Sequence, residues 1–174
     1  MGLWERLTSL GKRTSAAAFE RDVRKERGRR DPLSFDSLYD SICEKAGYGD
    51  ELHNLNAGER AFYVVSMFNM EVQNGGLCQF FVNSTRELAP EVAQALRAIG
   101  ADTYAELYES FCAKNGIDWS DLDSFVIDDV AEFEARRECA PFDDFDDAFY
   151  VRYETDSLED RLERYARAHR EQFI

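Results

Sequence analysis

The sequence contains few of the residues that interrupt secondary structure and lacks the long apolar runs of membrane proteins. Only three prolines and ten glycines occur among its 174 residues, which argues against a disordered or low-complexity chain. No apolar run approaches about 18 residues, the length of a membrane-spanning helix. Residues 1–30 are charged throughout and show no secretory signal pattern. We expect a cytoplasmic protein with no membrane span.

The residues that build common catalytic and metal sites are also scarce. The two histidines, His53 and His169, are isolated and have no metal-ligand spacing. The four cysteines form no CxxC pair, and each lies in or beside an apolar helical pattern, which favours buried free thiols. They are Cys43, Cys78, Cys112 and Cys139. Since no phosphate loop, nucleophile elbow or metal motif appears, we expect a non-enzymatic protein with no cofactor and no metal.

No stretch alternates apolar and polar residues for long enough to predict a β-strand. Apolar residues instead recur at helical spacing along most of the chain. Asn56 and Glu59 form a capping-box pattern before a long apolar helix, and Ser84 with Glu87 repeats it. A further helix is predicted to begin at Ser120. The spacing predicts an all-α fold, a compact single domain of about seven to nine helices.

The excess of acids over bases is large and unevenly distributed. The net charge of the chain is −14, but residues 1–30 hold nine Lys and Arg against four Asp and Glu. Residues 31–174 hold the other twelve bases and thirty-one acids, a net charge of −19. The chain therefore divides into a basic N-terminal arm (1–30), expected to be helical or partly disordered, and an acidic all-helical domain (31–174). An acidic field repels nucleic acid and anionic membranes and attracts basic proteins or cations.

One segment, EVQNGGLCQFFVNS (residues 71–84), has an unusual composition. Asn-Gly between strands would predict a hairpin, but both flanks here have helical spacing. Asn74 or Gly75 fits a left-handed helix end, and Gly76 lets the next helix approach closely. We interpret the segment as a structural joint between two helices, with one phenylalanine in the core, the other in a seam, and amides that bond orphan backbone groups. The residues of this joint are Asn74, Gly75, Gly76, Gln79, Phe80, Phe81 and Asn83.

Two other interpretations of the same segment stay open. Cys78 would be a catalytic thiol if an activating base lay beside it in the fold. Asn74, Gln79 and Asn83 would otherwise form a polar notch that serves an enzyme or binds a small molecule.

Two clusters of acids are candidates for a partner-binding surface. At about 100° per residue, one helix over residues 120–134 would place three acids in a solvent-facing stripe, with Asp129 on the apolar side. Either this helix breaks near Ile127, or Asp129 is a partly buried carboxylate with a partner. Around residues 142–147, phenylalanines at helical spacing would turn the neighbouring aspartates outward. Aspartates near a helix N-terminus also favour helix initiation, which is the purely structural explanation. The predicted acidic surface comprises Asp121, Asp128, Glu132, Asp143, Asp144, Asp146 and Asp147.

Four motifs together resemble a known family. They are NGGLCQFFVNS from Asn74, ALRAIGA from Ala95, FDDFDDAFY from Phe142 and LERYARAHREQF from Leu162. In this order and at these distances they resemble a bacterial DNA-mimic protein family with a domain of unknown function. The resemblance covers residues 35–173. It implies an all-helical fold, a dimer, and surface carboxylates that imitate duplex phosphates on the DNA-binding face of a transcription factor.

Three functions are compatible with these features. The first is an acidic protein-binding module that occupies, as a DNA mimic would, the basic DNA-binding face of a transcription factor or other nucleic-acid-binding protein. The second is an immunity protein that neutralises a basic toxin or enzyme through the same surface. The third is an enzyme or small-molecule binder that uses the notch near Asn74, Gln79 and Asn83. In the first two cases the partner is a basic protein, and no direct contact with nucleic acid is expected.

Overall fold

The computed structural model describes residues 31–138 and 140–174, so the predicted basic arm (1–30) and Cys139 lie outside the described residues. The described residues form seven α-helices joined by short 3-10 turns, and no β-strand, which confirms the predicted all-α class. The α-helices are α3 (Phe35–Lys45), α4 (Ala57–Val82), α5 (Ala89–Ala98), α6 (Asp102–Asn115), α7 (Val130–Glu138), α8 (Phe142–Tyr153) and α9 (Leu158–Ala168). The 3-10 turns are η1 (Gly47–Gly49), η2 (Leu52–Asn54), η3 (Ser84–Leu88), η4 (Leu122–Phe125) and η5 (Arg170–Gln172).

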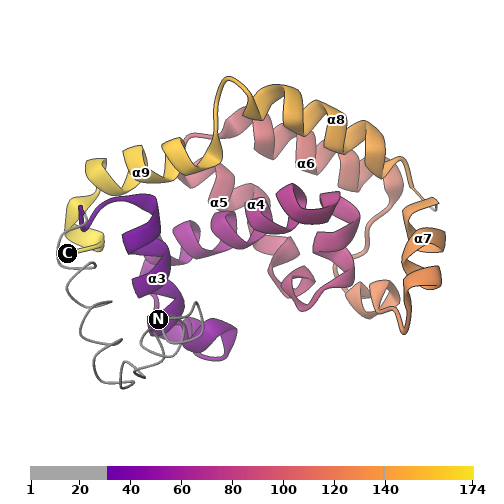
Figure 1. Ribbon diagram of the computed structural model, residues 1–174, viewed down its shortest axis with the longest axis horizontal. Helices are drawn as coiled ribbons and strands as arrows, with labels where there is room; N and C mark the ends of the chain where they lie inside the picture. The colour runs from indigo at the N-terminus through magenta and orange to yellow at the C-terminus, as the bar shows by residue number, and fades with distance from the viewer. Residues whose placement is uncertain (1–30, 139) are drawn as a thin grey trace, which may run out of the picture.

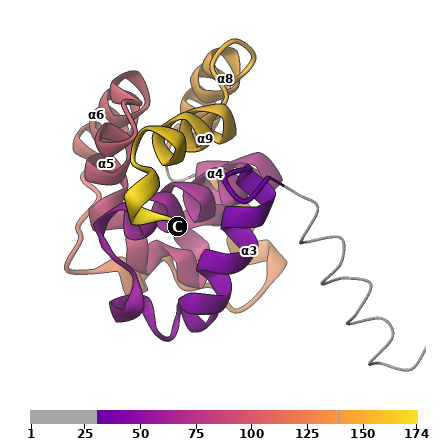
Figure 2. The same cartoon turned by 90° about the vertical axis from the view of Figure 1, so that its left-hand side faces the viewer.

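Helix α4 lies at the centre of the fold. It crosses the middle of the molecule, and α6 and α8 run side by side along one edge (Figure 1). In the view turned by 90°, α5 and α6 lie on one side of the molecule and α8 and α9 on the other (Figure 2). Phe62, Val65, Phe68 and Val72 of α4 are fully buried. Such a helix must be apolar over most of its circumference, because neighbours cover most of its faces.

The start of α4 follows the predicted capping box. The Asn56 side chain accepts a hydrogen bond from the Glu59 N–H at 3.0 Å, and the Glu59 carboxylate accepts one from the Asn56 N–H at 2.9 Å. Glu59 is only 8% exposed, and its charge is paired with Lys45 Nζ at 2.6 Å. This cap satisfies two orphan donors and fixes where the long helix begins.

Helix α4 is interrupted at the predicted joint. Gly75 (φ −156°, ψ 22°) and Gly76 (φ 80°, ψ 178°) depart from helical geometry. The left-handed φ therefore falls on Gly76 and not, as predicted, on Asn74 or Gly75. The reason is tertiary: a Cβ on Gly76 would lie 2.1 Å from Oδ2 of Asp146, a residue of α8. Only glycine combines this φ with so close a neighbour.

The helix predicted to begin at Ser84 begins later in the chain. Ser84–Leu88 forms η3, in which no side chain caps the helix, and α5 starts at Ala89 with Pro90 in its first turn. Proline is tolerated there because its missing N–H would have no partner within the helix.

The single helix predicted over residues 120–134 is wrong, and the alternative of a break near Ile127 is confirmed. The chain forms η4, passes through an extended stretch after Val126, and enters α7 at Val130. Local side-chain bonds compete with helix formation in this segment: the Ser124 hydroxyl, for example, donates to the Asp121 carbonyl at 2.7 Å. Serine and aspartate favour such local bonds over helical ones.

Asp129 acts as the cap of α7 and is not a buried carboxylate. Its Oδ1 accepts the Glu132 N–H at 2.9 Å, while the Glu132 carboxylate accepts the Asp128 N–H at 2.7 Å. This reciprocal pattern is close to a capping box, and it sets the start of α7 ten residues after the predicted start at Ser120.

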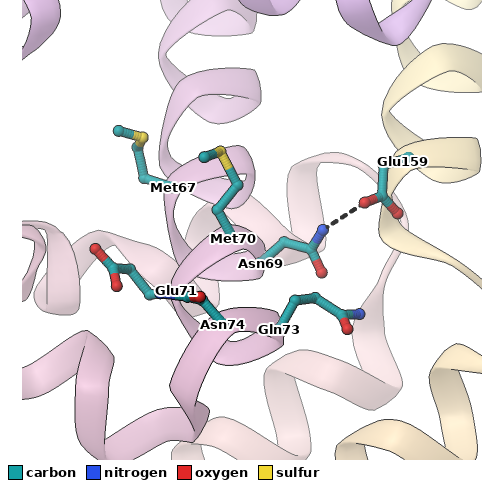
Figure 3. Close-up of a pocket in the computed structure, with 7 residues that line it drawn as sticks. All are labelled: Met67, Asn69, Met70, Glu71, Gln73, Asn74 and Glu159. Carbon is teal, nitrogen blue, oxygen red and sulfur yellow. Dashed lines mark hydrogen bonds between the residues drawn. The ribbon is translucent and has the colours of Figure 1, made fainter.

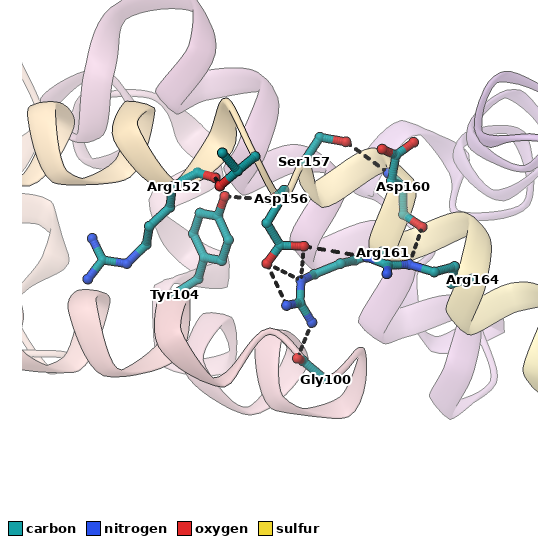
Figure 4. Close-up of polar contacts among 9 residues, drawn as sticks. Gly100, Tyr104, Arg152, Asp156, Ser157, Asp160, Arg161 and Arg164 are labelled. Atoms are coloured by element: carbon teal, nitrogen blue, oxygen red, sulfur yellow. Dashed lines mark hydrogen bonds and ion pairs between the residues drawn. The ribbon is translucent and has the colours of Figure 1, made fainter.

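A polar cluster ties the turn between α8 and α9 to the turn between α5 and α6 (Figure 4). The Arg161 guanidinium bonds both carboxylate oxygens of Asp156 and also donates to the Gly100 carbonyl. The Tyr104 hydroxyl donates to the Asp156 carbonyl at 2.7 Å. Ser157 caps α9 by accepting the N–H of Asp160. These contacts hold α9 and α8 in place relative to α5 and α6.

The joint makes a stability prediction. Replacing Gly76 with alanine should lower the free energy of unfolding by about 3 kcal/mol or more, because a left-handed alanine is strained and the new methyl displaces Asp146. Gly116→Ala is the matched control, since Gly116 (φ 63°) has no atom within 4 Å of its would-be Cβ. That control should cost only about 1 kcal/mol. Urea denaturation measures both, and equal losses would contradict the role given to Asp146.

Candidate functional site

Helix α8 presents acids to solvent because its other face is aromatic. Phe142, Phe145 and Phe149 are at most 2% exposed. Phe149 packs on Tyr104 and Phe68, with ring centroids 5.3 and 6.0 Å apart. The exposed acids on the opposite side, here called the α8 acidic face, are Asp143, Asp144, Asp147 and Glu154.

The charges of this face are little compensated. Asp143 forms an exposed ion pair with Arg137 of α7, at 2.6 Å. Within residues 31–138 and 140–174, no lysine or arginine forms an ion pair with Asp144, Asp147 or Glu154. Exposed pairs such as Asp143–Arg137 contribute at most about 1 kcal/mol. Most of the negative charge of this face is therefore available to a partner.

Asp146 departs from the predicted outward position. It is half-buried, and its Oδ1 accepts the Leu77 N–H at 2.8 Å. One turn further along α8, the Tyr150 hydroxyl donates to the Val72 carbonyl at 2.7 Å. Both backbone groups belong to the broken part of α4, one on each side of the two glycines. Helix α8 thus satisfies an orphan donor and a carbonyl beside the interruption.

Burial has an electrostatic consequence for Asp146. Loss of contact with water raises the pKa of its carboxyl group above the usual range, although the bond from Leu77 acts in the opposite direction. Asp143 and Asp147 add to the increase, because nearby negative charge disfavours ionisation. Asp146 is therefore a residue of the joint and not of the α8 acidic face.

The three other predicted surface acids do not form a stripe. Asp121 precedes η4, Asp128 lies between η4 and α7, and Glu132 lies in the first turn of α7. All three are exposed, but the break after η4 separates Asp121 from the other two. Glu132 is engaged in the α7 cap, so its main contact is structural.

A shallow groove joins the α7 segment to the joint. Its volume is about 570 Å³. The groove brings Asp128 and Asp129 next to the amides of Asn74, Gln79 and Asn83. Val82, Ile127 and Phe133 supply its apolar surface. The predicted polar notch therefore exists as a groove, and it contains two carboxylates that sequence reasoning did not assign to it.

The amides of the joint bond a carboxylate and not, as predicted, the orphan backbone groups. Gln79 Nε2 and Asn83 Nδ2 both donate to Glu71 Oε2, at 2.7 and 2.8 Å. Thr85 Oγ1 donates to the other oxygen of Glu71 at 3.3 Å. Glu71 thus connects the two halves of the broken helix and η3.

Both phenylalanines of the joint are buried, in different surroundings. Phe80 contacts Phe68 of α4, with ring centroids 5.4 Å apart. Phe81 stacks on Phe125 of η4 at 4.8 Å. Both are fully buried in the same hydrophobic core, so the two rings are not divided between the core and a seam as predicted.

A second pocket lies between α4 and α9 (Figure 3). Its volume is about 420 Å³. The buried Asn69 donates through Nδ2 to Glu159 Oε1 at 2.8 Å, and the Tyr153 hydroxyl donates to Glu159 Oε2. Its other lining residues are Met67, Met70, Glu71, Gln73 and Asn74. The only sequence signal for this pocket is a polar residue, Asn69, on the buried side of an apolar helix.

The cysteine side chains are inaccessible in the described part of the chain. Cys43, Cys78 and Cys112 are buried free thiols, and Cys78 is 1% exposed. Over residues 31–138 and 140–174, no group of three His, Cys, Asp or Glu side chains is placed to hold a metal ion. In the same residues, every helix is too short or too polar to cross a membrane.

Comparison with known proteins places the chain in a family. A family model described as DMP19-like protein matches residues 53–169, which is more than half of the chain. The chain therefore belongs to the DMP19-like family. No curated protein and no solved structure matches it. The matched segment includes the joint, α8 with its acidic face, and the pocket between α4 and α9.

The position of Asp146 predicts a pH-dependent effect of substitution. A raised pKa in the folded state means that ionised Asp146 opposes folding, so its contribution improves as pH falls through the folded pKa. Asp146→Asn keeps an acceptor for Leu77 without the charge and should increase the free energy of unfolding at pH 7. This gain should shrink as pH falls toward the ordinary carboxyl range.

Asp146→Ala provides the contrast. It removes the acceptor and should lower the free energy of unfolding by about 1–3 kcal/mol, because the Leu77 N–H loses its partner. Denaturant titrations at several pH values measure both variants. A loss of stability in Asp146→Asn that is present at pH 7 and disappears as pH falls would show that the carboxylate charge stabilises the joint, contrary to this account.

Proposed function

We propose that this protein is a non-enzymatic acidic module that imitates DNA and occupies the basic DNA-binding face of a transcription factor or another nucleic-acid-binding protein. The observation that carries this proposal is the α8 acidic face. It places Asp144 and Asp147 on one rigid helix and Glu154 at the C-cap of that helix, where all three are exposed to solvent. Membership of the DMP19-like family, a family of DNA mimics, supports the same function.

The electrostatics of this end of the molecule favour a basic partner. Residues 101–160 contain nineteen Asp and Glu against four Lys and Arg. A DNA-binding face makes most of its contacts to phosphates through Lys, Arg and backbone N–H groups. Carboxylates three or four residues apart on a helix are about 5–6 Å apart at Cβ, a spacing that can engage several such cations at once.

Rigidity is the second requirement of a mimic. Three buried phenylalanines fix one face of α8, and the bonds from Leu77 to Asp146 and from Tyr150 to Val72 fix its position along α4. A preorganised surface loses little conformational entropy on binding. The acidic face thus meets a partner in the geometry that it has in the free protein.

Two alternatives use features of the same structure. A basic toxin or enzyme would bind through the α8 acidic face, and only the identity of the partner separates that case from a DNA mimic. A small-molecule function would use the groove where Asn74, Gln79 and Asn83 meet Asp128 and Asp129. Substitutions in α8 would leave that function unchanged.

Binding to a basic DNA-binding domain should depend on the α8 acidic face. The test measures affinity for purified helix-turn-helix proteins from the source organism. For a protein that binds, Asp144→Asn combined with Asp147→Asn should weaken binding about tenfold, since each exposed charge pair contributes up to about 1 kcal/mol. The affinity of the unmodified chain should also fall as salt is raised, because exposed charges are screened.

The matched control removes the same charge elsewhere. Asp50→Asn combined with Glu87→Gln neutralises two exposed acids outside α8 and should change the affinity much less. Equal losses in the two double variants would mean that only net charge matters. Binding that ignores both salt and the α8 substitutions would contradict the proposal.

A further inference from the structure

The pocket between α4 and α9 contains a buried acceptor without a donor. Asn69 is 1% exposed, and its Oδ1 has no hydrogen-bond partner among the described residues. Its orientation is fixed, because Nδ2 donates to the Glu159 carboxylate and a turned amide would place two acceptors against each other. Figure 3 shows the oxygen turned away from Glu159, on the side of Gln73. A buried acceptor of this kind calls for a donor.

The charge of the pocket specifies what kind of donor fits. Among the described residues, only Asn69 and Tyr153 donate hydrogen bonds to the Glu159 carboxylate, and both donors are neutral. Burial, together with the Glu159 carboxylate, raises the pKa of Tyr153 to about 12, so that its hydroxyl stays protonated and remains a donor near neutral pH. The described residues that line the pocket include a second carboxylate, Glu71, but no lysine or arginine. A neutral donor would leave the negative charge of Glu159 uncompensated, whereas a cation would satisfy both groups.

The other lining residues of the pocket favour an organic cation over a metal ion. Met67 is half-buried and Met70 is 45% exposed, and both line the pocket. Thioether and methylene groups offer nothing to a hard cation, which needs six or more oxygen ligands. They do provide an adaptable apolar surface for an aliphatic stem.

We propose that this pocket binds an organic cation, a guanidinium or primary ammonium group on a short aliphatic stem. The cationic head donates to Asn69 Oδ1 and to a free lone pair of Glu159, and the stem packs on Met67 and Met70. The site lies on α4 and α9, apart from the α8 acidic face, and does not depend on the function proposed above. The same chemistry belongs to a free alkyl cation and to an arginine or lysine side chain of another protein.

Two methionines make the test specific. Met67 and Met70 both line the pocket, so methyl-labelled methionine gives two reporters in NMR spectra. Propylguanidinium and propylammonium are the probes, and neutral propylurea is the control ligand. We expect at least one of the two cations to give saturable shifts of the Met67 and Met70 methyl signals and a raised Tm. Propylurea should give neither effect.

Glu159→Gln is the decisive variant because it should remain folded. The new amide can donate to Asn69 once the Asn69 side chain turns over, and its oxygen can accept from Tyr153, so the pocket still has one unpartnered group, which becomes Asn69 Nδ2 in place of Oδ1. The variant should bind the cations at least about tenfold more weakly, because it lacks one member of a partly buried charge pair. Asp160→Asn is the matched control, with the same loss of charge at the neighbouring exposed residue, and should bind as the unmodified chain does.

The outcomes divide clearly. Shifts that are absent, equal with propylurea, or unchanged in Glu159→Gln would overturn the proposal and would leave Asn69 as a structural residue. A capped Gly-Arg-Gly peptide identifies the source of the cation. Shifts as large as those from propylguanidinium would indicate a protein side chain, and shifts from the free cations alone would indicate a small molecule.

Discussion

The hydrogen bond from the Leu77 N–H to the Asp146 carboxylate is the contact on which the rest of the arrangement depends. Helix α4 is the centre of the fold, and it is broken at Gly75 and Gly76. A broken helix leaves backbone donors and carbonyls without partners in the interior, where each costs about 1–3 kcal/mol. Asp146 takes the donor after the break, and Tyr150 bonds the Val72 carbonyl before it. Helix α8 is thereby fixed to the interrupted part of α4, where it supplies the hydrogen-bond partners of the Leu77 N–H and the Val72 carbonyl.

This constraint explains why two distant motifs go together. The Asn-Gly-Gly segment needs an acceptor near Gly76, and the FDDFDDAFY segment supplies it from α8 together with the tyrosine one turn later. Three of the four aspartates in that segment face solvent, and the fourth has the structural role. Burial disfavours the ionised form of Asp146, but the bond between Asp146 and Leu77 fixes α8 and so holds the neighbouring aspartates on a rigid surface. A structural joint and a candidate binding surface are therefore two sides of the same helix.

The sequence predicted the features that depend on local chemistry. Spacing within one helix predicts the Asn56–Glu59 cap and the aromatic face of α8. Helical spacing along most of the chain predicts the all-α class. All three predictions are confirmed. The role of Asp146 could not be predicted, because Leu77 lies 69 residues away in the chain. The sequence also contains no signal that distinguishes Asp146 from the other three aspartates of DDFDD. A break near Ile127 was one of two explanations for Asp129, and the sequence could not choose between them because Ser124 and Asp129 bond the backbone locally, which a periodicity of apolar residues does not reveal. The Asn69 pocket was missed because its charge comes from α9.

Competition with duplex DNA tests the central claim most directly. A basic helix-turn-helix protein that binds this chain is first loaded with its labelled operator, and the chain is then added while the fraction of bound DNA is measured. If the α8 acidic face imitates DNA, the two ligands exclude each other and the operator is released in proportion to the chain added. A ternary complex that contains the partner, the operator and this chain would contradict the account.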